Sequence, residues 1–413
     1  MPRGNLLYSG MFRLDIKNHT YIALAYFLLA AGLGILLRLF YLTPIAANYK
    51  YIIHAHSHTA LLGWVYLALT GIIYRLLFQT TKLPKKYLYI FLATNISLLG
   101  MLFSFPFQGY AVVSIIFSTL FLFCSYFYTG FFLRNTPAEH RHTQYFKLIK
   151  AALWYMVFSS IGPWALGAIM STLGKTSIWY KLSIYFYLHF QYNAWFLLGI
   201  LGVVFYLFQK LKLTFQPRDF KRFFYLLNSG VILSFFLSTY WTNPPIVFHF
   251  LGGLGVILLL LAFYQLFAFI LRNKYQLKAG LSSFNYQILK ITGILLVGKI
   301  FMQSLTAMPF FADLAFENLD FVIGYLHWVF LGFVSLALFG FLNWLKLIRL
   351  PRKAFYLYLS GFVISEILIF YKGFVLWLGL PFFSSYFLIL VLVSALIPIA
   401  VGWIIGLNFR KNE

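Results

Sequence analysis

The stretch IIHAHSHTALLGWVYLALTGIIY, residues 52–74, carries three histidines at one end of a long hydrophobic segment. A spanning α-helix needs about 20 mostly apolar residues, and this stretch contains no Asp, Glu, Lys or Arg. Because ionisable side chains are costly inside a bilayer, several of them at one depth indicate a functional site. The segment therefore predicts a membrane protein and the region where its chemistry takes place.

The composition extends this prediction to the whole chain of 413 residues, which is 62% hydrophobic and 10% charged. Globular domains carry about 25% charged residues, so most of this surface must face lipid. We expect an all-α integral membrane protein, a single twelve-helix bundle over 1–413, with a cytoplasmic N-terminal segment (1–19) and a cytoplasmic tail (409–413). The expected spans are 20–42, 51–78, 86–107, 110–133, 148–172, 178–209, 221–242, 245–272, 283–308, 320–346, 354–379 and 384–408.

The chain has a net charge of +24, and the placement of its basic residues along the sequence indicates the topology. Lys and Arg gather in alternate loops, whereas the loop around Asp313, Glu317 and Asp320 is acidic. By the positive-inside rule both termini and the basic loops are cytoplasmic, and the basic balance indicates anionic lipid as a partner and not nucleic acid. The one cysteine, Cys124, excludes a disulfide framework within the chain, an iron–sulfur cluster and a CxxCH haem attachment.

Three further hydrophobic segments also carry a histidine near the same end: His189 in YLHFQYNAWFLLG, His249 in FHFLGGLGV and His327 in YLHWVFLGF. With the N-terminus inside, spans 2, 6, 8 and 10 run inward, so these histidines lie at the outer level with those of span 2. Neutral imidazole coordinates haem iron, copper and zinc. The sequence predicts a metal or haem site whose candidate ligands are His54, His56, His58, His189, His249 and His327. His54 and His58 share a helix face, and His56 points elsewhere.

Twelve spans with histidines on spans 2, 6 and 10 resemble subunit I of the haem–copper oxidase superfamily. The segment HAHSHTALLGWVYLALTGIIYRLL looks like the span-2 signature of its divergent branches, and it is similar to the HAH motif of the NnrS family of haem- and copper-containing membrane proteins. The resemblance implies that His58 or His56, together with His327, are the axial ligands of one haem. It also implies that His189 stands at a copper-ligand position, with Tyr192 as a redox-active tyrosine one turn beyond.

The sequence departs from the oxidase pattern at the copper site. The outer end of span 7 reads FFLSTYWTNPP, residues 235–245, and lacks the adjacent histidine pair. Span 10 has one histidine where the oxidases have two, and His249 has no counterpart. We therefore expect copper to be partial or absent. If copper is bound, we expect a reorganised site in which His249 pairs with His189 or His54.

Charged residues within the spans suggest two further roles. Arg38 and Lys50 are candidates to bind haem propionates, which need cationic partners, or they extend to the membrane interface. Glu366, near the middle of span 11, is a candidate for a proton path or polar network. Alternatively, it forms a structural ion pair with Lys299 or Lys372.

These observations lead to an expected function. We expect a haem-binding membrane redox protein of a bacterial inner membrane, with an electron donor and partner subunits and with oxygen or nitric oxide as its ligand. Such a protein would be an oxidoreductase of the terminal oxidase or nitric oxide reductase type if it is an enzyme. The alternatives are a transporter or assembly factor for metal or haem, and a non-catalytic haem sensor. A transporter needs a polar path inward, and the inner halves of spans 2, 8 and 10 have almost no polar residues, which favours a fixed cofactor.

Overall fold

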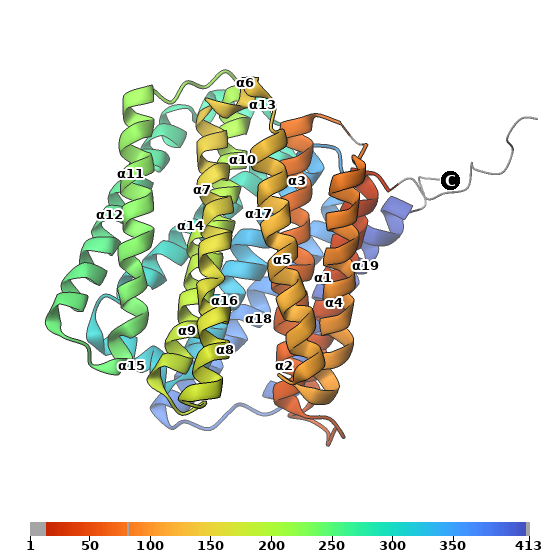
Figure 1. The fold of residues 1–413 in the computed structure, drawn as a ribbon. Helices are drawn as coiled ribbons and strands as arrows, with labels where there is room; N and C mark the ends of the chain where they lie inside the picture. Colours follow the sequence, from red (N-terminus) through yellow and green to blue (C-terminus); the bar gives the residue numbers. More distant parts are fainter. Residues whose placement is uncertain (1–13, 81, 410–413) are drawn as a thin grey trace, which may run out of the picture.

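The computed structural model describes residues 14–80 and 82–409 (Figure 1). Within these residues the chain is helical without a β-sheet, and twelve helical segments are long and apolar enough to cross a membrane. The all-α twelve-helix prediction is therefore confirmed. Most of the two predicted terminal segments, residues 1–13 and 410–413, lies outside the described residues. The first helix starts earlier than predicted, at Ile16, where the side chain of Asp15 accepts a hydrogen bond from the Asn18 amide.

The spans follow the predicted order, and several consist of two or three helical pieces. They are α1 (Ile16–Leu39); α2 (Tyr49–His58), η1 (Thr59–Tyr66) and α3 (Leu67–Phe78); α4 (Lys85–Gln108); α5 (Val112–Asn135); α7 (Gln144–Ser159) and α8 (Ile161–Thr172); α9 (Ile178–Phe190), η2 (Gln191–Phe196) and α10 (Leu197–Lys210); α11 (Pro217–Ser234) and η3 (Phe235–Thr242); α12 (Ile246–Arg272); α14 (Ser283–Leu305); α16 (Leu319–His327), η4 (Trp328–Val334) and α17 (Ser335–Trp344); α18 (Arg352–Leu378); and α19 (Tyr386–Phe409). Three short helices lie in loops: α6 (Ala138–Arg141), α13 (Lys274–Gly280) and α15 (Pro309–Glu317).

Spans 2, 6 and 10 form the centre of the bundle. The most apolar stretch is 83% buried in span 2, 94% in span 6 and 50% in span 10, against 28–44% in the nine other spans. Their second halves, α3, α10 and α17, contact one another. The histidine-bearing spans 2, 6 and 10 are thus the ones that the other helices surround, whereas span 8 belongs to the outer ring.

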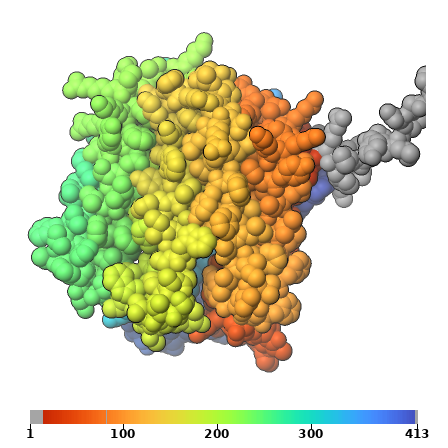
Figure 2. All heavy atoms as spheres, viewed as in Figure 1, coloured from red at the N-terminus to blue at the C-terminus, as the bar shows by residue number. Residues whose placement is uncertain are grey.

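The outer spans close around this centre in an arrangement that recurs every four spans. The third and fourth spans of each group pack closely together, as α4 with α5, α11 with α12, and α18 with α19. The ring closes where α1 packs against α19, which brings the first and last spans side by side (Figure 1). Large apolar side chains cover its outside, including Phe107, Phe250 and Tyr264, and Figure 2 shows one face of this surface. A surface of this kind requires lipid around it, so the chain is a multi-pass membrane protein.

The three central spans share a departure from regular α-helix. A π-helical segment begins directly after His58 and His327, as η1 and η4, and two residues after His189, as η2. Such segments are rare and occur frequently at functional sites. His249, in the outer ring, is followed instead by uninterrupted α-helix. The helix geometry thus sets the histidines of spans 2, 6 and 10 apart from that of span 8.

Candidate functional site

The imidazole of His56 is hydrogen-bonded to the backbone of the neighbouring span α1. Its helix α2 is capped at the N-terminus by Asn48, whose side chain accepts hydrogen bonds from the amides of Lys50 and Tyr51. Two turns later, the Nδ1 atom of His56 lies 2.8 Å from the carbonyl oxygen of Ala30 in α1. Because a carbonyl oxygen only accepts, Nδ1 carries the proton and Nε2 keeps its lone pair.

His327 has the same arrangement on span 10. Its Nδ1 atom lies 2.8 Å from the carbonyl oxygen of Ile323, one turn earlier in α16. The imidazole rings of His56 and His327 approach with centroids 6.4 Å apart and planes at 20°. Neither Nε2 atom has a hydrogen-bond partner among the described residues. Two neutral imidazoles from facing helices thus each retain a free electron pair.

The separation of these rings matches what one shared metal ion requires. Imidazole nitrogen binds metals at about 2 Å, so two such bonds and the adjoining half of each ring together come to about 6 Å. Gly34 provides room beside this pair, since a Cβ atom at that position would lie 3.2 Å from Cε1 of His56. A glycine on α1 therefore lets the His56 ring approach the helix backbone closely. The pair fits a metal held between two axial imidazoles.

Charged groups from two other spans, α1 and α18, lie in the region of the pair. Arg38 of α1 interacts electrostatically with His56, His327 and Glu366. The carboxyl group of Glu366 is buried, and neither of its oxygens has a hydrogen-bond partner. The alternative role of Glu366, an ion pair with Lys299 or Lys372, is not formed, because both lysines have other partners. Arg38 is instead the cation that interacts electrostatically with Glu366.

Lys372 pairs with Asp320 and not with Glu366. Its Nζ atom lies 3.0 Å from the carboxylate of Asp320 at the start of α16, and it also lies 4.9 Å from the ring centre of Tyr41. This pair ties α18 to α16 at the end of the bundle that holds the histidines. Lys50, the second propionate candidate, is exposed at the start of α2.

His54 and His58 share a face of span 2, as predicted, and this face is turned toward α4. The Nδ1 atom of His58 lies 2.9 Å from the carbonyl oxygen of His54, and its Nε2 atom lies 3.1 Å from the hydroxyl of Tyr110. The rings of His54 and His58 both pack against Phe105. Of the two candidates for the partner of His327, the structure brings His56 opposite it, whereas both nitrogens of His58 are already occupied.

His189 belongs to a separate buried network. Its Nε2 atom lies 2.8 Å from the carbonyl oxygen of Val231, and its Nδ1 atom lies 3.1 Å from the side-chain nitrogen of Asn193. The ammonium of Lys299 donates to the side-chain oxygens of Asn193 and Gln303, each at 2.5 Å. Both nitrogens of His189 are therefore engaged within the protein. The sequence pattern gave no indication of this chain of hydrogen bonds.

A cavity of about 380 Å³ adjoins this network between spans 6, 7, 9, 10 and 11. His189, Asn193, Gln303 and Tyr192 line it, and α15 covers it at the histidine end. The ring of Tyr192 lies 6.0 Å from that of Tyr325. Tyr192, predicted as a redox-active residue, thus shares a cavity with His189.

His249 contacts none of the other candidate histidines. Its ring stacks on Tyr240 with centroids 4.3 Å apart, and its own carbonyl oxygen accepts the Tyr240 hydroxyl at 3.0 Å. The expected pairing of His249 with His189 or His54 is not formed, since each of these contacts other residues. Within residues 14–80 and 82–409, no three His, Cys, Asp or Glu side chains come together as a metal site. The histidine layer therefore divides into the His56–His327 pair, the hydrogen-bonded His58 and His189, and His54 and His249, whose rings pack against aromatic side chains.

Comparison with known proteins adds no further support: neither a family model nor a curated protein matches this chain. The resemblance to the oxidase subunit therefore remains an expectation from the sequence alone. Sequence reasoning missed Gly34 and the Ala30 carbonyl. A signal was available, because Ala30, Gly34 and Arg38 recur every four residues and so share one face of α1.

Proposed function

We propose that this protein is a haem-binding membrane redox protein in which His56 and His327 supply the two axial ligands of one haem. The observation that supports this most directly is the His56–His327 pair, with centroids 6.4 Å apart and both Nδ1 atoms bonded to backbone carbonyls. Hydrogen bonds of this kind fix the tautomer and ring orientation of a ligating histidine and raise its basicity. Such a haem supplies one-electron chemistry.

The surrounding residues have roles that suit this cofactor. Arg38 provides a cation for a haem propionate, which forms strong charge-assisted hydrogen bonds with guanidinium groups. Gly34 leaves room for the His56 ring. The unbonded carboxyl group of Glu366 gives the same region a group that can hold a proton. Arg38, Glu366 and the histidine pair together form the polar centre of an otherwise apolar part of the bundle.

Electron transfer is the activity that this geometry favours. If His56 and His327 both held the haem iron, oxygen or nitric oxide would need a second centre with an open position. The cavity beside His189 and Tyr192 is the candidate location for such a centre. The main proposal is therefore the haem held by His56 and His327. We further propose oxygen or nitric oxide chemistry at the second centre, with an electron donor and partner subunits.

A transporter or metal permease is the main competing function, and the packing argues against it. The halves of spans 2, 6 and 10 beyond the histidines, α3, α10 and α17, pack against one another and are almost entirely buried and apolar. A passage through the centre would have to separate these helices and hydrate their faces, at a large cost in buried apolar area. A fixed cofactor requires no such movement.

The test is an absorption spectrum of the purified protein, reduced minus oxidised, with iron quantified alongside. We expect a low-spin haem that is lost or strongly changed in His56→Ala and in His327→Ala. His58→Ala is the matched control, since it removes an imidazole from the same helix whose nitrogens are both bonded elsewhere. Loss of the haem in His58→Ala with retention in His56→Ala would contradict the assignment.

A further inference from the structure

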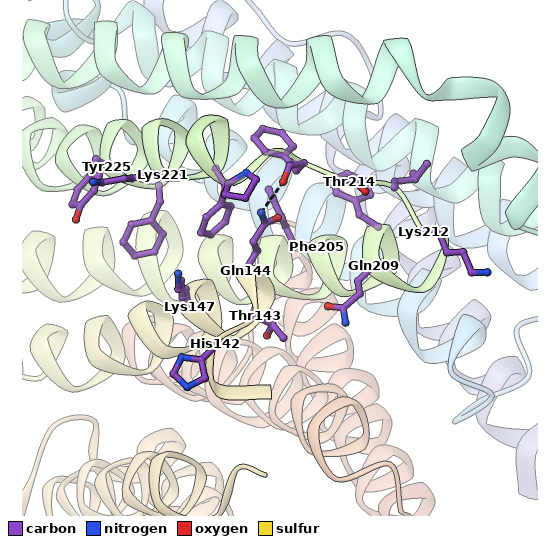
Figure 3. Close-up of a pocket in the computed structure, with 16 residues that line it drawn as sticks. His142, Thr143, Gln144, Lys147, Phe205, Gln209, Lys212, Thr214, Lys221 and Tyr225 are labelled. Atoms are coloured by element: carbon purple, nitrogen blue, oxygen red, sulfur yellow. Dashed lines mark hydrogen bonds between the residues drawn. The ribbon is translucent and has the colours of Figure 1, made fainter. Parts of the chain in front are cut away.

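A second cavity, of about 710 Å³, lies at the basic end of the bundle, opposite the histidines. It is formed where spans 5, 6 and 7 meet that surface, between α7, the end of α10 and the start of α11 (Figure 3). The loop between α10 and α11, residues 211–216, runs along it. The haem proposal does not involve these residues.

The floor of this cavity is rigid and aromatic. The ring of Phe215 lies 5.3 Å from that of Phe205 and 4.7 Å from that of Phe269. The side-chain nitrogen of Gln144 donates to the carbonyl oxygen of Phe215 at 2.7 Å, which ties the loop to α7. Lys212, in the same loop, adopts a left-handed backbone conformation with φ of 56°. The loop is therefore fixed by packing and hydrogen bonding, so the cavity is already formed.

Cationic side chains from separate elements line the opening. Lys147 comes from α7, Lys212 from the loop and Lys221 from α11, and His142 lies beside Lys147 (Figure 3). All three lysines are exposed, and no acidic side chain lines the cavity. The two ion pairs found in the described part of the chain involve other residues. Like charges held around one hollow create a positive potential that attracts anions.

We propose that this cavity binds the phosphate-bearing headgroup of an anionic phospholipid from the adjoining leaflet. Lys147 and Lys221 lie within the first turns of spans 5 and 7, which is the height of the headgroups. Basic residues at this height are the usual partners of anionic lipid. The wall continues from half-buried Phe224 to exposed Tyr225, so apolar surface lies next to the charges. A soluble phosphate would contact the lysines alone, whereas a lipid would contact the lysines with its headgroup and the apolar surface with its acyl chains.

The test compares lipid binding by the whole protein and by two charge-matched variants. Purified protein in detergent is titrated with phosphatidylglycerol and, separately, with phosphatidylcholine, and bound lipid is counted by native mass spectrometry. We expect Lys147→Ala/Lys221→Ala to weaken phosphatidylglycerol binding by about tenfold or more while phosphatidylcholine binding stays unchanged. The control is Lys85→Ala/Lys86→Ala, which removes two exposed lysines at the same end of the bundle, outside the cavity.

The alternatives have distinct outcomes. Equal losses in both variants would show that phosphatidylglycerol binds through general charge, and would overturn the proposal. Unchanged binding in the cavity variant would overturn it as well. Glycerol 3-phosphate is the probe for a soluble source. If it binds the wild type with an affinity that depends on Lys147 and Lys221 and displaces the lipid, then the site is one for soluble phosphates. The haem spectrum should be the same in all variants, so this test is independent of the haem assignment.

Discussion

Replacing Gly34 by Ala should weaken haem binding without unfolding the protein. The added Cβ would lie 3.2 Å from Cε1 and 3.6 Å from Nδ1 of His56, whereas carbon atoms pack comfortably at about 3.5–4.0 Å. The imidazole must therefore shift by a few tenths of an ångström, which strains its bond to the Ala30 carbonyl. Changes to such supporting hydrogen bonds typically reduce metal affinity by about 10- to 100-fold, and we expect the lower end of that range.

The stability of the Gly34→Ala protein should change little. Overpacking costs about 1–3 kcal/mol, and a 3.2 Å contact with a side chain that can shift belongs at the low end of that range. The gain of about 1 kcal/mol for alanine over glycine in a helix offsets a cost of this size. The assay is haem content and the midpoint potential of the purified protein, with thermal unfolding measured in parallel. Gly32→Ala is the control, because a Cβ at that position of α1 meets nothing within 4 Å. Identical haem content and potential in both variants would refute the assignment of Gly34 and His56 to the haem site.

Two further predictions concern topology and copper. In a Cys124→Ser background, Asp313→Cys and Lys85→Cys should react with a membrane-impermeant thiol reagent from opposite sides of the membrane, and labelling of both from one side would contradict the topology. Metal analysis should find iron clearly in excess of copper, and His189→Ala should retain the haem spectrum because His189 is bonded to the protein at both nitrogens. Stoichiometric copper that disappears in His189→Ala would restore the oxidase interpretation.

The number and order of the spans could be read from the sequence because hydrophobic length is a strong and local signal. The expected span 178–209, for example, is observed as Ile178–Lys210. The π-helical breaks in spans 2, 6 and 10 were not predicted. The π-helical segments η1, η2 and η4 depend on backbone adjustments in packed helices, which hydropathy does not report. Helix α15 lies in the predicted acidic loop, and its 9 residues fall well short of the about 20 that indicate a membrane span.

The candidate site could be predicted as a layer of histidines but not as a set of partners. Spacing within span 2 separated His56 from His54 and His58, yet it could not decide which of them faces span 10. That depends on the rotation of one helix against another, which the 6.4 Å approach of His56 and His327 reveals. The partner of the Glu366 carboxyl group could not be identified from sequence either. Its alternative partners could be proposed from sequence, whereas the Lys372–Asp320 and Lys299–Asn193 contacts appear only in three dimensions.

The most direct test of the central claim is the rescue of His327→Gly by imidazole in solution. The substitution leaves space where the side chain stood, so free imidazole can occupy it and coordinate the iron. We predict that the low-spin haem signal is lost in His327→Gly and returns as imidazole is added, while His142→Gly, at an exposed histidine at the other end of the bundle, behaves as wild type. An unchanged signal in His327→Gly would contradict the account, as would a loss that occurs in His249→Gly instead.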